Sequence, residues 1–388
     1  MKYLIKNGTV INEGKIEQQD ILLENNLITK IGKDISDASA TIIDAADKYI
    51  IPGIIDDQVH FREPGLTHKG NIYSESKAAV AGGITSYMEM PNTVPSAVSI
   101  DLLEQKYQIG KATSLANYSF FMGTTNNNLE ELLRLNPLEV CGVKIFMGSS
   151  TGNMVVDNPA SLESIFREVK MLIATHCEDD PMIKKNQQIF VEKYGDSLDS
   201  TSHHLIRSEE ACYKSSSFAV ELAKKHNTRL HILHISTAKE LSLFDNKIPS
   251  RAKRITAEAC LHHLWFSNED YVQKGNFIKW NPAIKTAHDR AAILQAVIDN
   301  RIDVIATDHA PHTFEEKSKS YIEAPSGGPL VQHALVALLE MYHQQKITLE
   351  KIVEKTSHTV ADLFQIDKRG YIREGYHADM VLVNLNHP

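Results

Sequence analysis

The sequence predicts an α/β fold in which a (β/α)8 TIM barrel carries a smaller β unit. After Pro52, short apolar runs alternate with amphipathic segments of helical length, which is typical of parallel strands joined by helices. Before Pro52, apolar stretches end at turn residues such as Asn7-Gly8 and Asn25-Asn26, which is typical of antiparallel strands. The chain is therefore expected to combine a large barrel with a small sheet.

The two ends of the chain are expected to share that small sheet. Residues 1–51 are predicted to form short antiparallel strands with turns at Asn7-Gly8 and at 12–14. Residues 366–388 contain a strand-like stretch at 377–383, which is expected to return to this sheet. Residues 52–365 would then form the barrel.

The barrel prediction depends on eight βα units. Eight units favour a closed barrel over an open sheet, and no GxGxxG opens a helix to suggest a dinucleotide site. The expected strands are 54–59, 85–90, 118–122, 142–147, 171–176, 229–235, 254–259 and 303–307. The expected helices include 73–81, 162–169, 208–226, 237–244 and 288–300, followed by 330–343, 349–354 and 360–364.

Composition excludes several classes of function. The chain has 388 residues and a net charge of -8 without a basic run, which argues against a nucleic-acid or anionic-membrane surface. Its apolar runs are shorter than a membrane span, and its first residues are too polar for a signal peptide. Four cysteines without a CxxC pair are expected to be buried thiols. A cytoplasmic protein is the expectation.

Polar side chains gather where the predicted strands end. These ends meet at one face of a barrel, where catalytic groups are usual. Each of these residues also has a plain structural explanation, as a hydrogen-bonded histidine, a paired lysine or a helix cap, but their coincidence at one face favours a metal site. Imidazoles with a carboxylate suit zinc better than manganese or iron. Addition of CO2 to the lysine would give a carbamate able to bridge two cations. The candidate ligands are His60, Lys144, His176, His234 and Asp308.

Several segments together resemble a known family. The segment 57–65 is similar to the D-x-H-x-H-x-R-E-P-G signature of the cyclic amidohydrolases, and within them of the dihydroorotases. Met90-Pro91-Asn92-Thr93, Asn281-Pro282 and the segments 174–178, 231–237 and 306–312 follow in the family's order. The resemblance implies a (β/α)8 barrel with a composite β-sandwich. It also implies that Arg62, Asn92 and His312 hold a substrate carboxylate and that Asn281 contacts a pyrimidine ring.

The sequence departs from the family's pattern in three places. Gln58 stands where the signature has its first histidine, so the outer metal is expected to be weakly held or absent, with one or two zinc ions per chain. Lys144 follows the carbamylated-lysine variant of the family. The chain is also shorter than the family's usual length, so we expect the last sandwich strands to be missing.

The resemblance implies a reaction and leaves alternatives open. The reaction is the reversible hydrolysis of dihydroorotate to N-carbamoyl-L-aspartate in pyrimidine synthesis, by a metal-bound hydroxide, with Asp308 as base and then acid. A hydantoinase or allantoinase is one alternative, against which the carboxylate-binding fork of Arg62 argues. The other is a non-catalytic scaffold for a partner such as aspartate transcarbamoylase. A homodimer and a mobile lid at 313–328 are further expectations.

Overall fold

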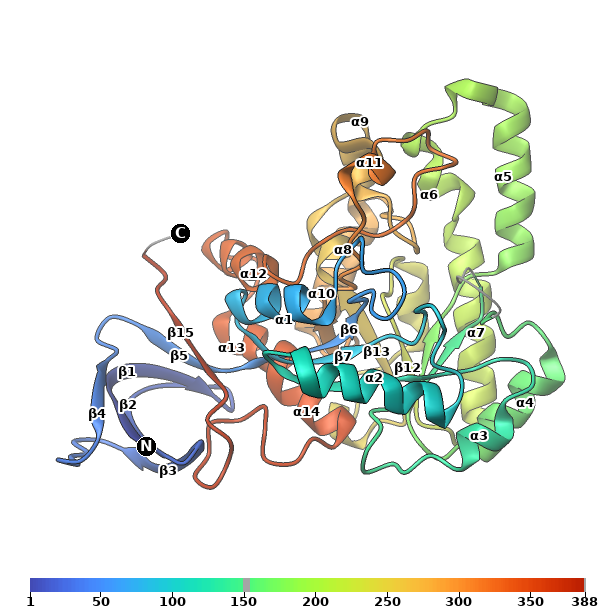
Figure 1. Cartoon of the computed structure of the whole chain (residues 1–388). Coiled ribbons are helices and arrows are strands. Elements are labelled where there is room, and N and C mark those ends of the chain that lie inside the picture. Colours follow the sequence, from blue (N-terminus) through green and yellow to red (C-terminus); the bar gives the residue numbers. More distant parts are fainter. Residues whose placement is uncertain (149–153, 387–388) are drawn as a thin grey trace.

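A mixed sheet lies beside the barrel, on the left in Figure 1. The computed structural model describes residues 1–148 and 154–386. The strand order is β15-β5-β1-β2-β3, with β4 also paired to β1, and β15 runs antiparallel to β5. The predicted return of the chain to the N-terminal sheet is therefore confirmed. The strands are β1 (Lys2–Asn12), β2 (Lys15–Glu24), β3 (Leu27–Gly32), β4 (Thr41–Asp44), β5 (Tyr49–Pro52) and β15 (Met380–Val383).

The predicted turn at Asn7-Gly8 is wrong. Strand β1 continues through it with a register shift between Ile5 and Gly8, and Asn7 takes a left-handed φ of 64°. The Asn7 N–H donates to the Asp20 carboxylate at 3.0 Å, so the irregular residue keeps a partner. An asparagine tolerates this conformation, and the result is a bulge inside one strand. Strand β1 also runs parallel to β4 and β5, so the sheet is mixed and not purely antiparallel.

The barrel contains the eight predicted strands. Every neighbouring pair is parallel, and β8 and β9 form one strand interrupted at Phe121. A parallel bridge between Val59 and His309 joins the first strand to the last. The strands are β6 (Ile54–Val59), β7 (Ile84–Glu89), β8 (Asn117–Phe120), β9 (Met122–Gly123), β10 (Val143–Phe146), β11 (Ile173–His176), β12 (Leu230–Ile232), β13 (Ile255–Cys260) and β14 (Val304–Ala306).

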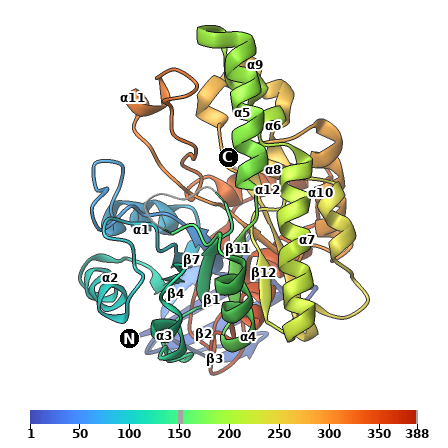
Figure 2. The same ribbon diagram turned by 90° about the vertical axis from the view of Figure 1, so that its right-hand side faces the viewer.

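Helices surround the strands and bury the apolar faces that the sequence indicated (Figures 1 and 2). Helix α7 begins after Ser208, whose side chain accepts from the Ala211 N–H, and ends at the left-handed Asn227. The helix predicted at 237–244 is only a 3-10 segment at Lys239–Leu243. The covering helices are α1 (Ile72–Ala81), α2 (Ile100–Thr113), α3 (Leu129–Leu133), α4 (Pro159–Glu168), α7 (Glu209–His226), α10 (Ala287–Ile298), α12 (Ala334–His343), α13 (Leu349–Val353) and α14 (Thr359–Phe364).

Further helices rise above one end of the barrel, at the top of Figures 1 and 2. The longest of them, α5 (Asp180–Tyr194), follows β11 directly and so starts at the carboxyl end of a strand. These helices stand around the face where the predicted ligands emerge. Across the described residues, none of the helices has the length and apolar character that a bilayer span needs. The others are α6 (His203–Ile206), α8 (Leu261–Trp265), α9 (Tyr271–Lys274) and α11 (Phe314–Lys317).

Candidate metal and substrate site

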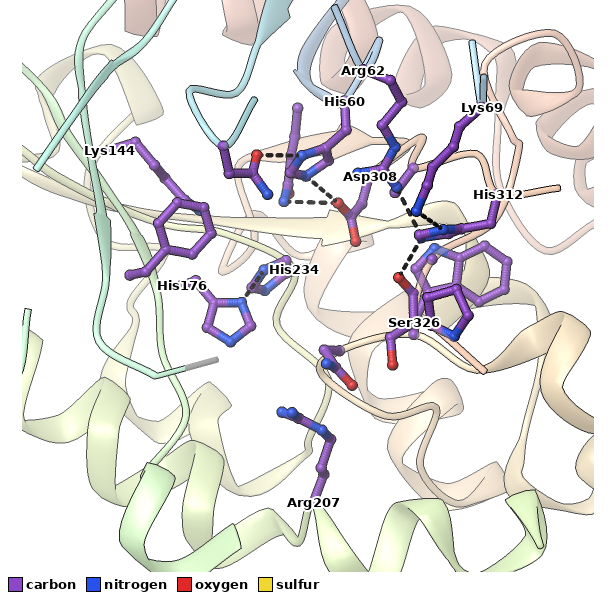
Figure 3. A pocket seen from close by; sticks show the side chains of 18 residues that line it. His60, Arg62, Lys69, Lys144, His176, Arg207, His234, Asp308, His312 and Ser326 are labelled. Atoms are coloured by element: carbon purple, nitrogen blue, oxygen red, sulfur yellow. Dashed lines mark hydrogen bonds and ion pairs between the residues drawn. The ribbon is translucent and has the colours of Figure 1, made fainter. Parts of the chain in front are cut away.

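A pocket of about 390 Å³ lies at the carboxyl ends of the barrel strands. Figure 3 shows its side chains converging from loops that are far apart in the sequence. Every residue predicted to hold a metal or the substrate lines it, as does Gln58. Those predicted residues are His60, Arg62, Asn92, Lys144, His176, His234, Asn281, Asp308 and His312.

Two histidines face one another on one side of the pocket. His176 Nδ1 lies 3.0 Å from His234 Nε2, and His176 Nε2 lies 3.0 Å from the Glu178 carboxylate. Burial lowers the pKa of both imidazoles, and most strongly that of His234. Both rings are therefore neutral at physiological pH and carry lone pairs for a metal. Glu178 fixes the His176 tautomer by accepting its Nε2–H.

Asp308 lies between Gln58 and His60 on the other side. Its Oδ1 is 3.2 Å from His60 Nε2 and accepts from Gln58 Nε2 at 3.1 Å. His60 Nδ1 lies 2.8 Å from Asn92 Oδ1, so His60 donates there and turns its Nε2 lone pair inward. Burial raises the pKa of Asp308 to about 7, although Lys144 and His176 oppose this shift. A carboxyl group with this pKa can both accept and release a proton near neutral pH.

Lys144, on β10, is buried in the wall of the same pocket. Its Nζ lies 4.6 Å from the centre of the Phe146 ring. Burial lowers the pKa of Lys144 to about 8, although Asp308 and Glu258 favour its charged form. A sizeable fraction of the amine is therefore neutral at pH 7 to 8 and can react with CO2.

The donor set fits a divalent metal of borderline hardness. Neutral imidazole nitrogens and a carboxylate are the ligands that zinc prefers. The 3.0 Å separation of His176 Nδ1 and His234 Nε2 suits two ligand atoms turned toward one ion. Gln58 gives its amide N–H to Asp308, so that amide acts as a hydrogen-bond donor where the family signature has a ligand.

The opposite end of the pocket is cationic. Arg62 Nη2 lies 3.0 Å from His312 Nε2, and Lys69 Nζ lies 3.1 Å from His312 Nδ1 (Figure 3). Burial, and then the charges of Arg62 and Lys69, lower the pKa of His312 to about 3. His312 is therefore neutral, and the net positive charge comes from Arg62, because Lys69 is paired with the Glu316 carboxylate at 3.1 Å. This end suits an anionic group such as a carboxylate.

The segment 313–328 forms part of the pocket wall through Pro325, Ser326 and Gly327. It contains α11 and is tied down by the buried Lys317, whose Nζ donates to the Pro325 carbonyl at 2.9 Å and to the Gly327 carbonyl at 2.7 Å. The segment therefore borders the site on one side. Its opening and closing stay a prediction.

Three site residues have backbone conformations that ordinary side chains avoid. Arg62, His234 and Asp308 have φ values of 70°, 41° and 47°. The His234 N–H donates to the Glu258 carboxylate at 2.8 Å, and Arg62 Nε donates to the Pro311 carbonyl at 3.0 Å. Such strain, held in place by buried hydrogen bonds, is typical of functional sites.

Sequence reasoning missed several residues of this site. Lys69 and Arg207 line the pocket, and Glu178 supports His176 and forms an ion pair with Arg207. Glu178 stands two residues after His176, a spacing that could have indicated a supporting carboxylate. Lys69 and Arg207 lie in loops whose positions no local pattern gives. A separate buried group, Asp57 with His231 and Glu258, was also not predicted.

Comparison with known proteins identifies the family of this chain. A sequence profile described as "Amidohydrolase family" matches residues 49–388. The chain therefore belongs to the amidohydrolase family. A dihydroorotase of Methanosarcina acetivorans is 34% identical over 98% of this chain and 83% of its own length. A dihydroorotase of Carboxydothermus hydrogenoformans is 33% identical over 99% of this chain and 89% of its own length.

Solved structures resemble the fold. An L-hydantoinase from Arthrobacter aurescens superposes with a TM-score of 0.92 and 24% identity, covering 98% of this chain and 86% of that one. A dihydropyrimidinase from Brevibacillus agri superposes with a TM-score of 0.89 and 24% identity, covering 99% and 86%. The predicted barrel architecture is confirmed by these matches.

The support that Glu178 gives to His176 leads to a prediction. Glu178→Gln should weaken zinc binding by about 10- to 100-fold, because the neutral amide orients the imidazole less firmly and makes its nitrogen less basic. Competition with a fluorescent chelator measures the affinity. Asp180→Asn, at an exposed ion pair on α5, is the control and should bind zinc as the unaltered protein does. Equal zinc affinity in Glu178→Gln and the control would show that Glu178 does not support the metal ligand.

Proposed function

We propose that this chain is a dihydroorotase, which interconverts dihydroorotate and N-carbamoyl-L-aspartate. The observation that carries the proposal is the division of the pocket into two ends. One end holds neutral imidazoles with a carboxylate of raised pKa, and the other holds Arg62 and Lys69. Dihydroorotate has the same two parts, a cyclic amide to be opened and a ring carboxylate. The dihydroorotases at 31–34% identity support the same assignment.

The metal would be held by His60, His176, His234 and Asp308 together with Lys144. Zinc bound there supplies a polarised carbonyl and a water molecule of lowered pKa. Asp308 accepts the proton of the attacking water and then delivers it to the leaving amide nitrogen. Its pKa of about 7, raised by burial, suits both halves of this transfer.

The remaining polar groups orient the substrate. Arg62 offers guanidinium donors to the ring carboxylate, and the Asn92 amide adds a donor beside it. Neutral His312 borders the same end and orients Arg62, whose Nη2 lies 3.0 Å from its Nε2. Asn281 lines the pocket with a buried Oδ1 that has no partner among the described residues, so this oxygen suits a ring N–H. The substrate would then lie with its carboxylate at Arg62 and its scissile amide at Asp308.

We further propose that Lys144 is carbamylated and that Gln58 weakens one of two zinc positions. The buried amine, with a pKa of about 8, supports the first point. The hydrogen bond from the Gln58 amide to Asp308 supports the second, because this orientation makes Gln58 a donor rather than a metal ligand. A cytoplasmic location and association with a second copy or with aspartate transcarbamoylase stay predictions.

The cationic end of the pocket and the protonation states at its other end distinguish a dihydroorotase from the two alternative functions. A hydantoinase or allantoinase substrate has no carboxylate in the position of the dihydroorotate carboxylate and would leave the buried Arg62 without a substrate anion, whereas Lys69 already pairs with Glu316 at 3.1 Å. A non-catalytic scaffold would need neither the raised pKa of Asp308 nor neutral imidazoles facing it. The proposed activity explains both features.

The proton transfer assigned to Asp308 predicts the result of one substitution. Asp308→Asn should reduce kcat for dihydroorotate hydrolysis by at least about 10²- to 10⁴-fold, because an amide cannot shuttle the proton. The loss of absorbance of dihydroorotate measures the rate, and circular dichroism checks the fold. Asp299→Asn, at a half-buried ion pair with Arg301 outside the pocket, should keep full activity. Activity within a few-fold of the unaltered protein would remove Asp308 from the mechanism.

The planar fork of Arg62 predicts a change in substrate selectivity. Arg62→Lys should raise KM for dihydroorotate at least about tenfold, because a point charge replaces a bidentate donor, while cyclic amides without the carboxylate change little. Steady-state rates on dihydroorotate and dihydrouracil give the ratio. The exposed Arg134→Lys is the matched control. Equal losses on both substrates would mean that Arg62 is structural.

The carbamate predicted on Lys144 can be detected directly. Native mass spectrometry should show an added mass of CO2 that disappears on acidification, because a carbamate loses CO2 when protonated. Lys144→Ala should lose the zinc of the pocket and activity, and short carboxylic acids should restore part of both by replacing the missing oxygens. An unmodified Lys144 in the active, zinc-loaded protein would contradict the prediction.

A further inference from the structure

Three buried charged side chains meet inside the barrel, apart from the ligands described above. Asp57 comes from β6, His231 from β12 and Glu258 from β13, and each is 0% exposed. His231 Nε2 lies 3.2 Å from Asp57 Oδ2 and 3.8 Å from Glu258 Oε2. One donor atom of each side chain lies within 4.8 Å of the others. None of the three residues lines the pocket.

The hydrogen bonds of this group show which atoms remain to be satisfied. His231 Nδ1 pairs with Thr256 Oγ1 at 2.8 Å, and Glu258 Oε1 accepts from the His234 N–H at 2.8 Å. In the described part of the chain, Asp57 Oδ1, Asp57 Oδ2, His231 Nε2 and Glu258 Oε2 are buried and have no hydrogen-bond partner outside the group. Within it, His231 Nε2 faces both carboxylates. Neighbouring residues thus hold His231 Nδ1 and Glu258 Oε1, while the other donor atoms of the three side chains face one another. Metal ligands with supporting partners have this arrangement.

The charge of the group also requires a cation. Two carboxylates in a water-free interior are costly unless they are neutralised. A proton on His231 Nε2 can bond only one of them, because Asp57 Oδ2 lies 3.2 Å away and Glu258 Oε2 lies 3.8 Å away. One proton on His231 would leave a net negative charge and several carboxylate oxygens without partners. A divalent ion would neutralise both carboxylates and bind all of these atoms.

The distances suit a metal ion. Ligand bonds of about 2.1 Å in a tetrahedral zinc site place neighbouring ligand atoms about 3.4 Å apart. The separations of 3.2 and 3.8 Å from His231 Nε2 lie on either side of that value. One imidazole and two carboxylates form a mixed nitrogen and oxygen set that suits zinc or manganese.

We propose that Asp57, His231 and Glu258 bind a structural divalent metal ion inside the barrel. This second centre would tie β6 to β12 and β13, which are distant in sequence. It would also fix Glu258, whose other oxygen holds the backbone of His234 in its left-handed conformation. The proposal does not rest on dihydroorotase activity, because its ligands are separate from those of the pocket.

Metal content in a protein that lacks the pocket ligands tests the proposal. A Lys144→Ala/His176→Ala variant, purified with zinc and dialysed, should keep about one zinc per chain by plasma mass spectrometry. Adding Asp57→Asn should remove that zinc. Adding Glu240→Gln should not, because this buried carboxylate has Ser216 and Thr237 as partners and lies outside the group. Retention of zinc after Asp57→Asn, or no zinc in the Lys144→Ala/His176→Ala variant, would overturn the proposal.

A measurement on the unaltered protein decides the matter if a variant does not fold. Anomalous difference maps from crystals grown with zinc, recorded on both sides of the zinc absorption edge, should show a peak among Asp57, His231 and Glu258. A peak confined to the pocket, with no peak inside the barrel, would mean that protons alone balance the two carboxylates. That result would contradict the second metal centre independently of any effect on activity.

Discussion

The closure of the barrel between its first and last strands is the contact on which the site depends. The parallel bridge of Val59 with His309, and the hydrogen bond from the His60 N–H to the His309 carbonyl at 2.7 Å, join β6 to the end of β14. This contact brings Asp308 beside His60 and Gln58, from which it is separated by most of the chain. It also places Arg62 next to His312. The contact between β6 and the end of β14, called the seam below, therefore forms both ends of the pocket.

Burial then sets the chemistry of the groups at this seam. The same removal from water that raises the pKa of Asp308 to about 7 lowers the pKa of Lys144 to about 8 and keeps the histidines neutral. Burial thus gives the site its proton-transfer group Asp308, its reactive amine Lys144 and its neutral histidine ligands. The backbone strain at His234 and Asp308 is balanced by buried hydrogen bonds around them.

Much of this could be predicted from the sequence because the signals are local. Strand length, alternation and the polar residue after each strand are local signals, and they indicated the eight strands and the five candidate ligands, which line the pocket. The substrate-binding candidates came from the resemblance to the dihydroorotases. The turn expected at Asn7-Gly8 failed because a left-handed asparagine serves a bulge as well as a turn. Lys69 and Arg207 depend on how long loops fold back over the barrel, and the meeting of Asp57 with His231 depends on which strands face each other across it. No local pattern contains that information.

The most direct test of the proposed function is the turnover of dihydroorotate, hydantoin and dihydrouracil by the zinc-loaded protein and by the same protein after removal of metal with a chelator. The zinc-loaded protein should hydrolyse dihydroorotate on the order of 10²-fold or more faster, in kcat/KM, than either substrate without the carboxylate, because only dihydroorotate carries a carboxylate that pairs with Arg62. Metal removal should abolish the reaction, and zinc should restore it. Comparable turnover of all three substrates, or no turnover of dihydroorotate with zinc bound, would contradict the account.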